Sequence, residues 1–224
     1  MLRKLENDLG YHYKDQELLR KALSHSSYAN ENFQDALHSY ERLEFLGDAI
    51  LGFVTAEYLY QTFPDKLEGE LTKIRAELVC EKNLSAVARE LSLGDYLLLG
   101  HGEEQGGGRD RSGILCDAME SLIAAAYIDS GFEAAKGIIL RLILPKLTRV
   151  LNTHDYKTEF QELVQRKKDQ VITYELTAES GPDHCKEFTV RVLLNGETVG
   201  HGSGSSKKRA EQAAAAQAIK KIFG

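Results

Sequence analysis

The sequence has little cysteine and no long apolar run. Its three cysteines, Cys80, Cys116 and Cys185, lie far apart in the chain. An odd and scattered set suits neither a disulfide framework nor a zinc site, so we expect reduced thiols in a cytoplasmic protein. No apolar segment approaches the ~20 residues of a membrane-spanning helix. Acidic residues Glu6 and Asp8 also come too early for a signal peptide, and none is expected.

The charge is acidic overall but unevenly distributed. The 224 residues are 42% hydrophobic and 28% charged, as in ordinary globular proteins, and would fill one large domain or two modest ones. The formal net charge is −6, which alone argues against a nucleic-acid partner. Residues 155–224, however, contain 11 basic and 10 acidic side chains, against 17 and 24 in the remainder. This locally basic tail keeps a nucleic-acid partner open.

The first two thirds of the chain have the apolar spacing of helices. Asp15 is expected to cap an early helix, Pro64 to end a long one, and Pro145 to kink or break the last one. The Gly106–Gly108 stretch lacks the lysine and spacing of a phosphate-binding loop and is predicted to be a connector. The helical segments lie around residues 18–23, 43–54, 71–78, 84–91, 114–128 and 138–151.

From about residue 155 the pattern changes to helix, three strands and helix. Residues 158–168 have helical spacing, whereas 172–178 and 188–194 alternate as strands do. Asn195-Gly196 predicts a hairpin turn into a third strand at 198–201, and a final helix follows Lys207. The predicted organisation is therefore an all-α domain over residues 1–151, a linker at 152–155, and an α-β-β-β-α domain over residues 156–224.

Four carboxylates form two pairs, each on one face of a predicted helix. Glu44 and Asp48 are spaced i,i+4, and Asp117 and Glu120 are spaced i,i+3. Like charges so spaced repel one another, and these lie among apolar residues where an unpaired charge is costly. A hard divalent cation, Mg²⁺ or in its place Mn²⁺, would compensate an all-oxygen cluster. Such a site suits metal-dependent hydrolysis of a phosphodiester.

Two other interpretations of the carboxylates stay open at this point. They could be ordinary solvated or salt-bridged helix residues. They could also belong to a di-iron carboxylate bundle, although that site uses Glu-x-x-His and the segment Asp117–Glu120 contains no histidine.

The string Glu41-Arg42-Leu43-Glu44-Phe45-Leu46-Gly47-Asp48 resembles the signature motif of the ribonuclease III family. The segments 23–31, 68–79, 107–109 and 114–129 resemble further family segments in the same order. The resemblance implies that Glu44, Asp48, Asp117 and Glu120 form the metal-binding quartet, with Asp48 and Glu120 essential to catalysis. It also implies supporting roles for Glu41 and Glu68. Phe45 would pack into a partner subunit, its alternative being an ordinary core position. The chain departs from common family residues at Ser26, Tyr40, Ala49, Ser121 and Ala124.

The tail resembles a double-stranded RNA-binding domain. A helix N-terminus attracts phosphate, and Lys207 and Lys208 add positive charge there. Thr158, Gln161 and Gln165 share one face of the first tail helix and suit 2′-hydroxyls and base edges. His184, in the loop between the first two strands, would reach a minor groove. As isolated features, a lysine run or a loop histidine is more often ordinary surface.

The two resemblances together imply an endoribonuclease that cuts both strands of double-stranded RNA. They imply Mg²⁺-dependent hydrolysis by a homodimer, with 5′-phosphates and short 3′ overhangs, acting on ribosomal RNA precursors and structured messenger RNAs. No membrane and no small-molecule cofactor are expected. Two alternatives from other classes remain, a duplex-binding regulator that no longer cuts and a structural RNA chaperone.

Overall fold

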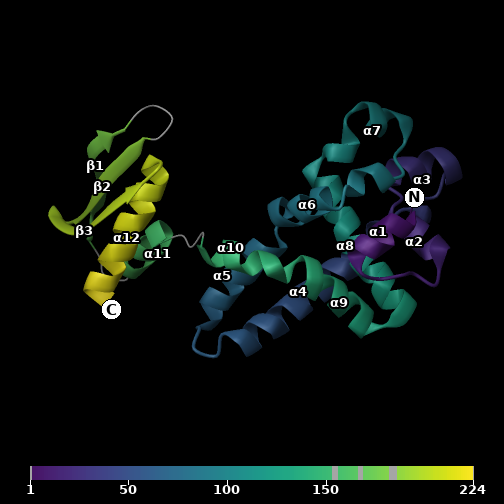
Figure 1. Cartoon of the computed structure of the whole chain (residues 1–224), viewed down its shortest axis with the longest axis horizontal. Coiled ribbons are helices and arrows are strands. Elements are labelled where there is room, and N and C mark those ends of the chain that lie inside the picture. The colour runs from purple at the N-terminus through teal and green to yellow at the C-terminus, as the bar shows by residue number, and fades with distance from the viewer. Residues whose placement is uncertain (1, 153–155, 166–168, 182–185, 224) are drawn as a thin grey trace. The chain divides into compact units, whose positions relative to one another are not determined.

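A computed structural model describes residues 2–152, 156–165, 169–181 and 186–223 (Figure 1). The chain divides into two compact units, Met1–Asn152 and Thr153–Gly224. The predicted succession of a helical part and an α-β-β-β-α part is confirmed. Most of the predicted linker, 153–155, lies outside the described residues. Among the helices that are described, none combines the length and the apolar character needed to cross a membrane.

The first unit is a helical assembly built around α8 (Ser112–Ser130). Residues Ile114 to Ala126 of this helix are almost all buried, so α8 is the central element that its apolar sequence predicts. It packs most extensively on α4 (Glu41–Thr62) and also on α6 (Glu81–Glu90). The other helices are α1 (Leu2–Leu9), α2 (Gln16–Ala22), α3 (Ser26–Phe33), α5 (Glu68–Val79), α7 (His101–Gln105), α9 (Phe132–Leu142) and α10 (Leu147–Asn152).

The helix ends follow the predicted signals. The Asp15 carboxylate accepts hydrogen bonds from the backbone N–H groups of Glu17 and Leu18, at 2.9 and 3.1 Å, and so caps α2. Helix α4 ends at Thr62, because the residue before Pro64 is pushed out of the helical region. Pro145 lies in a short 3₁₀ turn that separates α9 from α10, so the last predicted helix is broken.

The second unit packs two helices on an antiparallel sheet. Its elements are α11 (Tyr156–Gln165), β1 (Ile172–Ser180), β2 (Glu187–Leu194), β3 (Glu197–Gly204) and α12 (Lys207–Phe223), with strand order β1-β2-β3. Asn195 and Gly196 join β2 to β3 with φ angles of +53° and +87°. Positive φ at both positions is the geometry of the tight hairpin turn that Asn-Gly predicts.

The core of the second unit depends on small residues where β3 meets α12. Ala210, Ala214 and Ala218 share one face of α12 and are fully buried. A Cβ on Gly202 would lie 2.1 Å from the backbone nitrogen of Ala214, so only glycine lets the strand approach the helix this closely. Gly202 and Gly204 therefore belong to β3, which is longer than the predicted strand at 198–201.

Two side chains of the second unit are more exposed than a regular pattern would give. Ile222 shares the spacing of Ala210, Ala214 and Ala218, but in the last turn of α12 it is 38% exposed. Leu176 is 44% exposed, although it alternates with Ile172 and Tyr174. The register of β1 shifts between Leu176 and Ala178, and this bulge breaks the alternation.

Candidate metal centre and nucleic-acid interface

The candidate metal centre lies where α4 and α8 cross. Gly47 makes the crossing possible, because a Cβ at this position would lie 1.9 Å from the backbone carbonyl oxygen of Glu120. A side chain there would force the two helices apart. The close approach brings Glu44 and Asp48, one turn apart on α4, toward Asp117 and Glu120 on α8.

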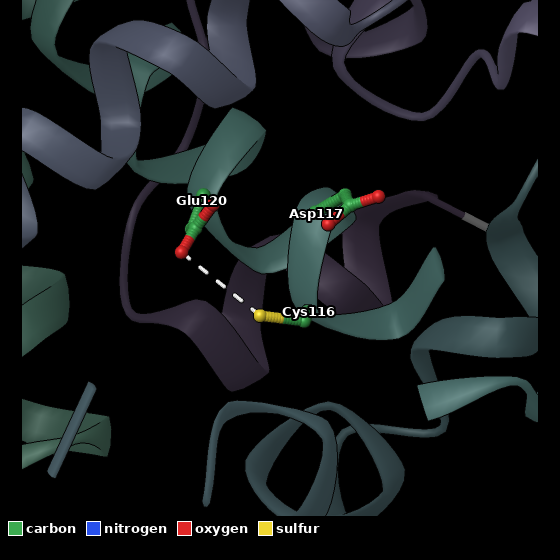
Figure 2. Close-up of side chains that lie close together, drawn as sticks. All are labelled: Cys116, Asp117 and Glu120. Atoms are coloured by element: carbon green, nitrogen blue, oxygen red, sulfur yellow. Dashed lines mark hydrogen bonds between the residues drawn. The ribbon is translucent and has the colours of Figure 1, made fainter. Parts of the chain in front are cut away.

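The tightest group at the crossing is Cys116, Asp117 and Glu120 (Figure 2). One oxygen or sulfur atom from each lies within 4.8 Å of the others. The Cys116 thiol contacts Glu120 Oε1 at 3.9 Å, as a weak hydrogen-bond donor. Burial raises the pKa of that thiol, and the charges of Glu120 and Asp117 raise it further, so sulfur is protonated near neutral pH.

Glu120 is the most buried member of the quartet, with 8% of its surface exposed. Burial raises its pKa to about 8, and the negative charges of Asp48, Asp117 and Glu44 contribute. Without a cation, this carboxyl group therefore holds a proton at neutral pH. A bound divalent cation would favour the carboxylate and release that proton.

The pKa values of the other partly buried carboxyl groups are raised as well. The pKa of Glu44 is raised by burial and by the charges of Asp117, Glu41 and Asp48. The pKa of Asp117 is also raised, chiefly by burial, while nearby His25 counteracts the rise. Within the described parts of the chain, no Lys or Arg forms an ion pair with a quartet member. The quartet is therefore a group of acidic side chains without a Lys or Arg partner among the described residues.

The supporting residues expected from sequence lie in different places. Glu41 is exposed at the start of α4, and its charge acts on Glu44 and Asp117. Glu68 begins α5, where it accepts a hydrogen bond from the Thr72 hydroxyl at 2.8 Å. It is not among the main charges that act on the quartet.

Phe45 is not a core residue of this unit. Its side chain is 81% exposed, although it lies between the buried positions Leu43 and Gly47 of α4. Exposure of a large aromatic side chain to this extent leaves it available to a partner surface.

Four neighbours of the quartet were missed by sequence reasoning. Cys116 had a usable signal, because it precedes Asp117 and is spaced i,i+4 from Glu120. Tyr40 also had one, because it is spaced i,i+4 from Glu44. His25 and Glu81 come from other segments and had none. Glu81 begins α6, and its charge raises the pKa of Asp117.

The donor set fits a hard divalent cation. Asp117 and Glu120 of α8 lie in one tight group, while Glu44 and Asp48 of α4 lie outside that group and act on Glu120 through their charges. All four offer carboxylate oxygens, the ligands that hard divalent cations prefer. The one sulfur atom is a protonated, buried thiol, which is a poor ligand in that state. Mg²⁺ and Mn²⁺ favour such oxygen ligands.

The second unit exposes the side chains predicted to contact nucleic acid. Thr158, Gln161 and Gln165 lie on the surface of α11, and Lys207 and Lys208 are exposed at the start of α12. Lys157 Nζ of α11 forms an ion pair with Glu211 Oε2 of α12 at 2.7 Å, which joins the two helices near their N-terminal ends. His184 lies outside the described residues.

The N-terminus of α12 concentrates positive potential. Lys207, Lys208 and Arg209 occupy its first turn, and no acidic residue lies there. The helix dipole adds to their charge, because its free N–H groups point outward at the same end. Lys207 Nζ also lies 6.0 Å from the centroid of the Phe188 ring, a cation–π contact that orients the side chain.

Comparisons with protein families divide the chain where the structure does. Residues 15–147 match the family model described as Ribonuclease-III-like, and residues 156–222 match the double-stranded RNA binding motif. Two similar proteins are both called Ribonuclease 3. The one from Pelotomaculum thermopropionicum is 50% identical over 97% of this chain and 91% of its own. The one from Listeria monocytogenes serotype 4a is 44% identical over 97% of this chain and 96% of its own.

A similar solved structure is the nuclease domain of ribonuclease III from Campylobacter jejuni. It is 45% identical in sequence, with a TM-score of 0.60, and the match covers 65% of this chain and 97% of that domain. Its description concerns flexibility in a region involved in dimer formation. The matched part corresponds in extent to the helical unit that carries the quartet.

Proposed function

The chain belongs to the ribonuclease III family, and from this premise we propose that it is an endoribonuclease that hydrolyses double-stranded RNA with Mg²⁺. The observation that carries the proposal is the group of uncompensated carboxylates at the crossing of α4 and α8. A regulator that only bound duplex RNA would have no use for a cluster whose negative charges destabilise one another.

Glu44, Asp48, Asp117 and Glu120 would hold the cation, and Mn²⁺ would replace Mg²⁺ through the same oxygen ligands. A bound Mg²⁺ supplies two things to phosphodiester hydrolysis, a water of lowered pKa that attacks phosphorus and neutralisation of the charge that develops on the phosphate. Asp48 and Glu120 would be the residues most needed for catalysis. Glu120 would give up its proton as a cation binds, because burial and the neighbouring negative charges raise its pKa to about 8 and a cation would counteract both.

The second unit would supply affinity and orientation on the duplex. Lys207 and Lys208 would bind phosphates across the groove, while Thr158, Gln161 and Gln165 would face a minor groove with uncharged hydrogen-bonding groups. His184 would contact a second minor groove. This division of contacts recognises the shape of A-form RNA and not its sequence.

A homodimer would provide one quartet for each strand. The strands of a duplex are related by local two-fold symmetry, which a two-fold dimer matches. The exposed ring of Phe45 supports a partner surface on the first unit.

Two staggered cuts would leave 5′-phosphates and short 3′ overhangs. Ribosomal RNA precursors and structured messenger RNAs are the proposed substrates, in the cytoplasm, where the free thiols of Cys80 and Cys116 would stay reduced.

The test is cleavage of a long RNA duplex by the purified full-length protein. We expect short duplex products with 5′-phosphates in Mg²⁺, no products after addition of EDTA, and no cutting of a single strand of the same sequence. Binding without cleavage in saturating Mg²⁺ and Mn²⁺ would contradict the proposal and favour a non-cutting RNA-binding protein.

A further inference from the structure

Tyr40 has a buried hydroxyl group without a partner. It lies immediately before α4, its side chain is 1% exposed, and its hydroxyl oxygen forms no hydrogen bond with any described residue. Leaving a buried hydroxyl unpaired costs about 1–3 kcal/mol. A phenylalanine would fill the same space without that cost, so packing alone does not explain the oxygen atom.

The charges of the candidate metal centre act on this hydroxyl. Tyr40 is spaced i,i+4 from Glu44, which puts both on the same side of α4. Besides burial, the charges of Asp117 and then Glu44 are the main causes that raise the pKa of the hydroxyl. It therefore stays protonated, and beside carboxylates its useful role is that of a donor.

The residue is held in this orientation from several sides. Its backbone N–H donates to the carbonyl oxygen of Ser24 at 2.8 Å, and its own carbonyl oxygen accepts the N–H of Glu44 at 2.9 Å. Its ring packs edge-to-face on the His25 ring, with 5.8 Å between centroids. His25 in turn counteracts the rise in the pKa of Asp117. The ring contact therefore joins Tyr40 to a second neighbour of the candidate metal centre.

We infer that Tyr40 is a positioning residue of the metal centre, whose hydroxyl donates a hydrogen bond to the Asp117 carboxylate when a cation is bound. The bond would keep that carboxylate turned toward the cation. The inference rests on the proposed metal centre. Groups that orient metal ligands in this way typically change metal affinity about 10–100-fold when they are removed, and we expect the lower end for a single neutral donor.

The test is Tyr40→Phe in the full-length protein, which removes the oxygen and keeps the ring. Mn²⁺ affinity is measured by calorimetric titration without RNA, and the unfolding temperature is measured in EDTA. We expect about tenfold weaker Mn²⁺ binding and an equal or higher unfolding temperature without metal. In cleavage assays the Mg²⁺ concentration for half-maximal rate should rise by a similar factor, while the rate at saturating Mg²⁺ changes less.

Tyr13→Phe is the matched control. The Tyr13 hydroxyl is also buried in the helical unit, but it donates to the carbonyl oxygen of Leu122 at 2.9 Å. Its loss should lower the unfolding temperature and leave Mn²⁺ affinity unchanged. The inference is overturned if Tyr40→Phe binds Mn²⁺ within twofold of the unmodified protein, whatever its stability.

The wild-type titration separates this inference from the proposed function. If the unmodified protein binds no Mn²⁺, the metal centre itself is wrong and the role of Tyr40 falls with it. If the unmodified protein binds Mn²⁺ and Asp117→Asn does not, the centre stands and the Tyr40→Phe result tests the hydroxyl alone.

Discussion

At the scale of single residues, Glu120 combines burial with a role that requires charge. Its neighbours at the crossing are themselves acidic, so the metal-free protein keeps it neutral by protonation. The metal-free folded protein favours the protonated form of this side chain, whereas metal binding favours its carboxylate form. Two measurements follow from this conflict.

Glu120→Gln should abolish cleavage and preserve RNA binding. The substitution keeps the shape of the buried side chain and removes the charge that would hold the cation. Because a catalytic cation contributes several kcal/mol to the transition state, we expect the rate to fall about a hundredfold or more. Cleavage and filter binding of the same duplex measure the two effects. Equal loss of both, or unchanged cleavage, would contradict the assignment.

The stability of the metal-free protein should fall as pH rises from about 4.5 to about 8. The pKa of Glu120 is about 8 in the folded chain, against 4.5 for an ordinary glutamate, so the folded state binds the proton more tightly. Its contribution to the free energy of unfolding is complete below pH 4.5 and is lost toward pH 8, by roughly 1.4 kcal/mol per pH unit at most.

Denaturant unfolding in EDTA at fixed protein concentration measures this effect. The difference between the unmodified protein and Glu120→Gln isolates it from other titrating groups. Glu120→Gln should become the more stable of the two near pH 8.5, and Mg²⁺ should restore the stability of the unmodified protein only. Parallel pH profiles would show that Glu120 does not carry the shift.

At the scale of secondary-structure elements, the crossing of α4 and α8 can be tested with two glycines of one helix. Gly47→Ala would place a Cβ 1.9 Å from the Glu120 carbonyl oxygen, whereas a Cβ at Gly52 would meet nothing within 4 Å. We expect Gly47→Ala to destabilise the protein by about 1–3 kcal/mol and to weaken Mn²⁺ binding. Gly52→Ala should stabilise it by about 0.5–1 kcal/mol. Similar behaviour of the two variants in thermal unfolding would contradict the role of Gly47.

The start of α12 can be compared with its other end in the same way. Lys207→Ala with Lys208→Ala should weaken duplex binding and reduce the slope of log affinity against log salt by about 1 per lost phosphate contact. Lys220→Ala with Lys221→Ala, in the last turn of the same helix, should leave the slope unchanged. Titrations at several salt concentrations measure it. If only the second pair changes the slope, the proposed phosphate-binding end is wrong.

The elements themselves were largely predictable, because their signals are local. The Asp15 cap, the stop before Pro64 and the Asn195-Gly196 turn each depend on a few neighbouring residues, and each is confirmed. The bulge after Leu176 and the exposure of Ile222 were not predictable, because they depend on contacts with other elements and not on neighbouring residues in the chain.

The site was predictable only in part, for the same reason. Helical spacing identified the two carboxylate pairs, since each pair lies within one helix. His25 and Glu81 also act on Asp117, but they come from other segments, so no local pattern predicts their position. The close approach at Gly47 is likewise a property of two helices together.

At the scale of the whole molecule, the proposed dimer can be tested at Phe45. Truncating a central aromatic side chain of an interface typically costs about 2 kcal/mol or more, so Phe45→Ala should weaken dimerisation about thirtyfold. Sedimentation analysis over a range of concentrations measures it. Tyr60→Ala is the control, because Tyr60 is 76% exposed on the same helix but fifteen residues away. Equal dissociation constants for both variants and the unmodified protein would contradict the proposed interface.

The position of Gly47 at the point where the two ligand-bearing helices touch has a practical consequence. The spacing of the ligands is set by interior packing, so divalent-cation affinity reports on the state of the interior. A substitution that shifts α8 relative to α4 at this crossing should therefore lower that affinity. Cation titration would then report small displacements at the crossing itself.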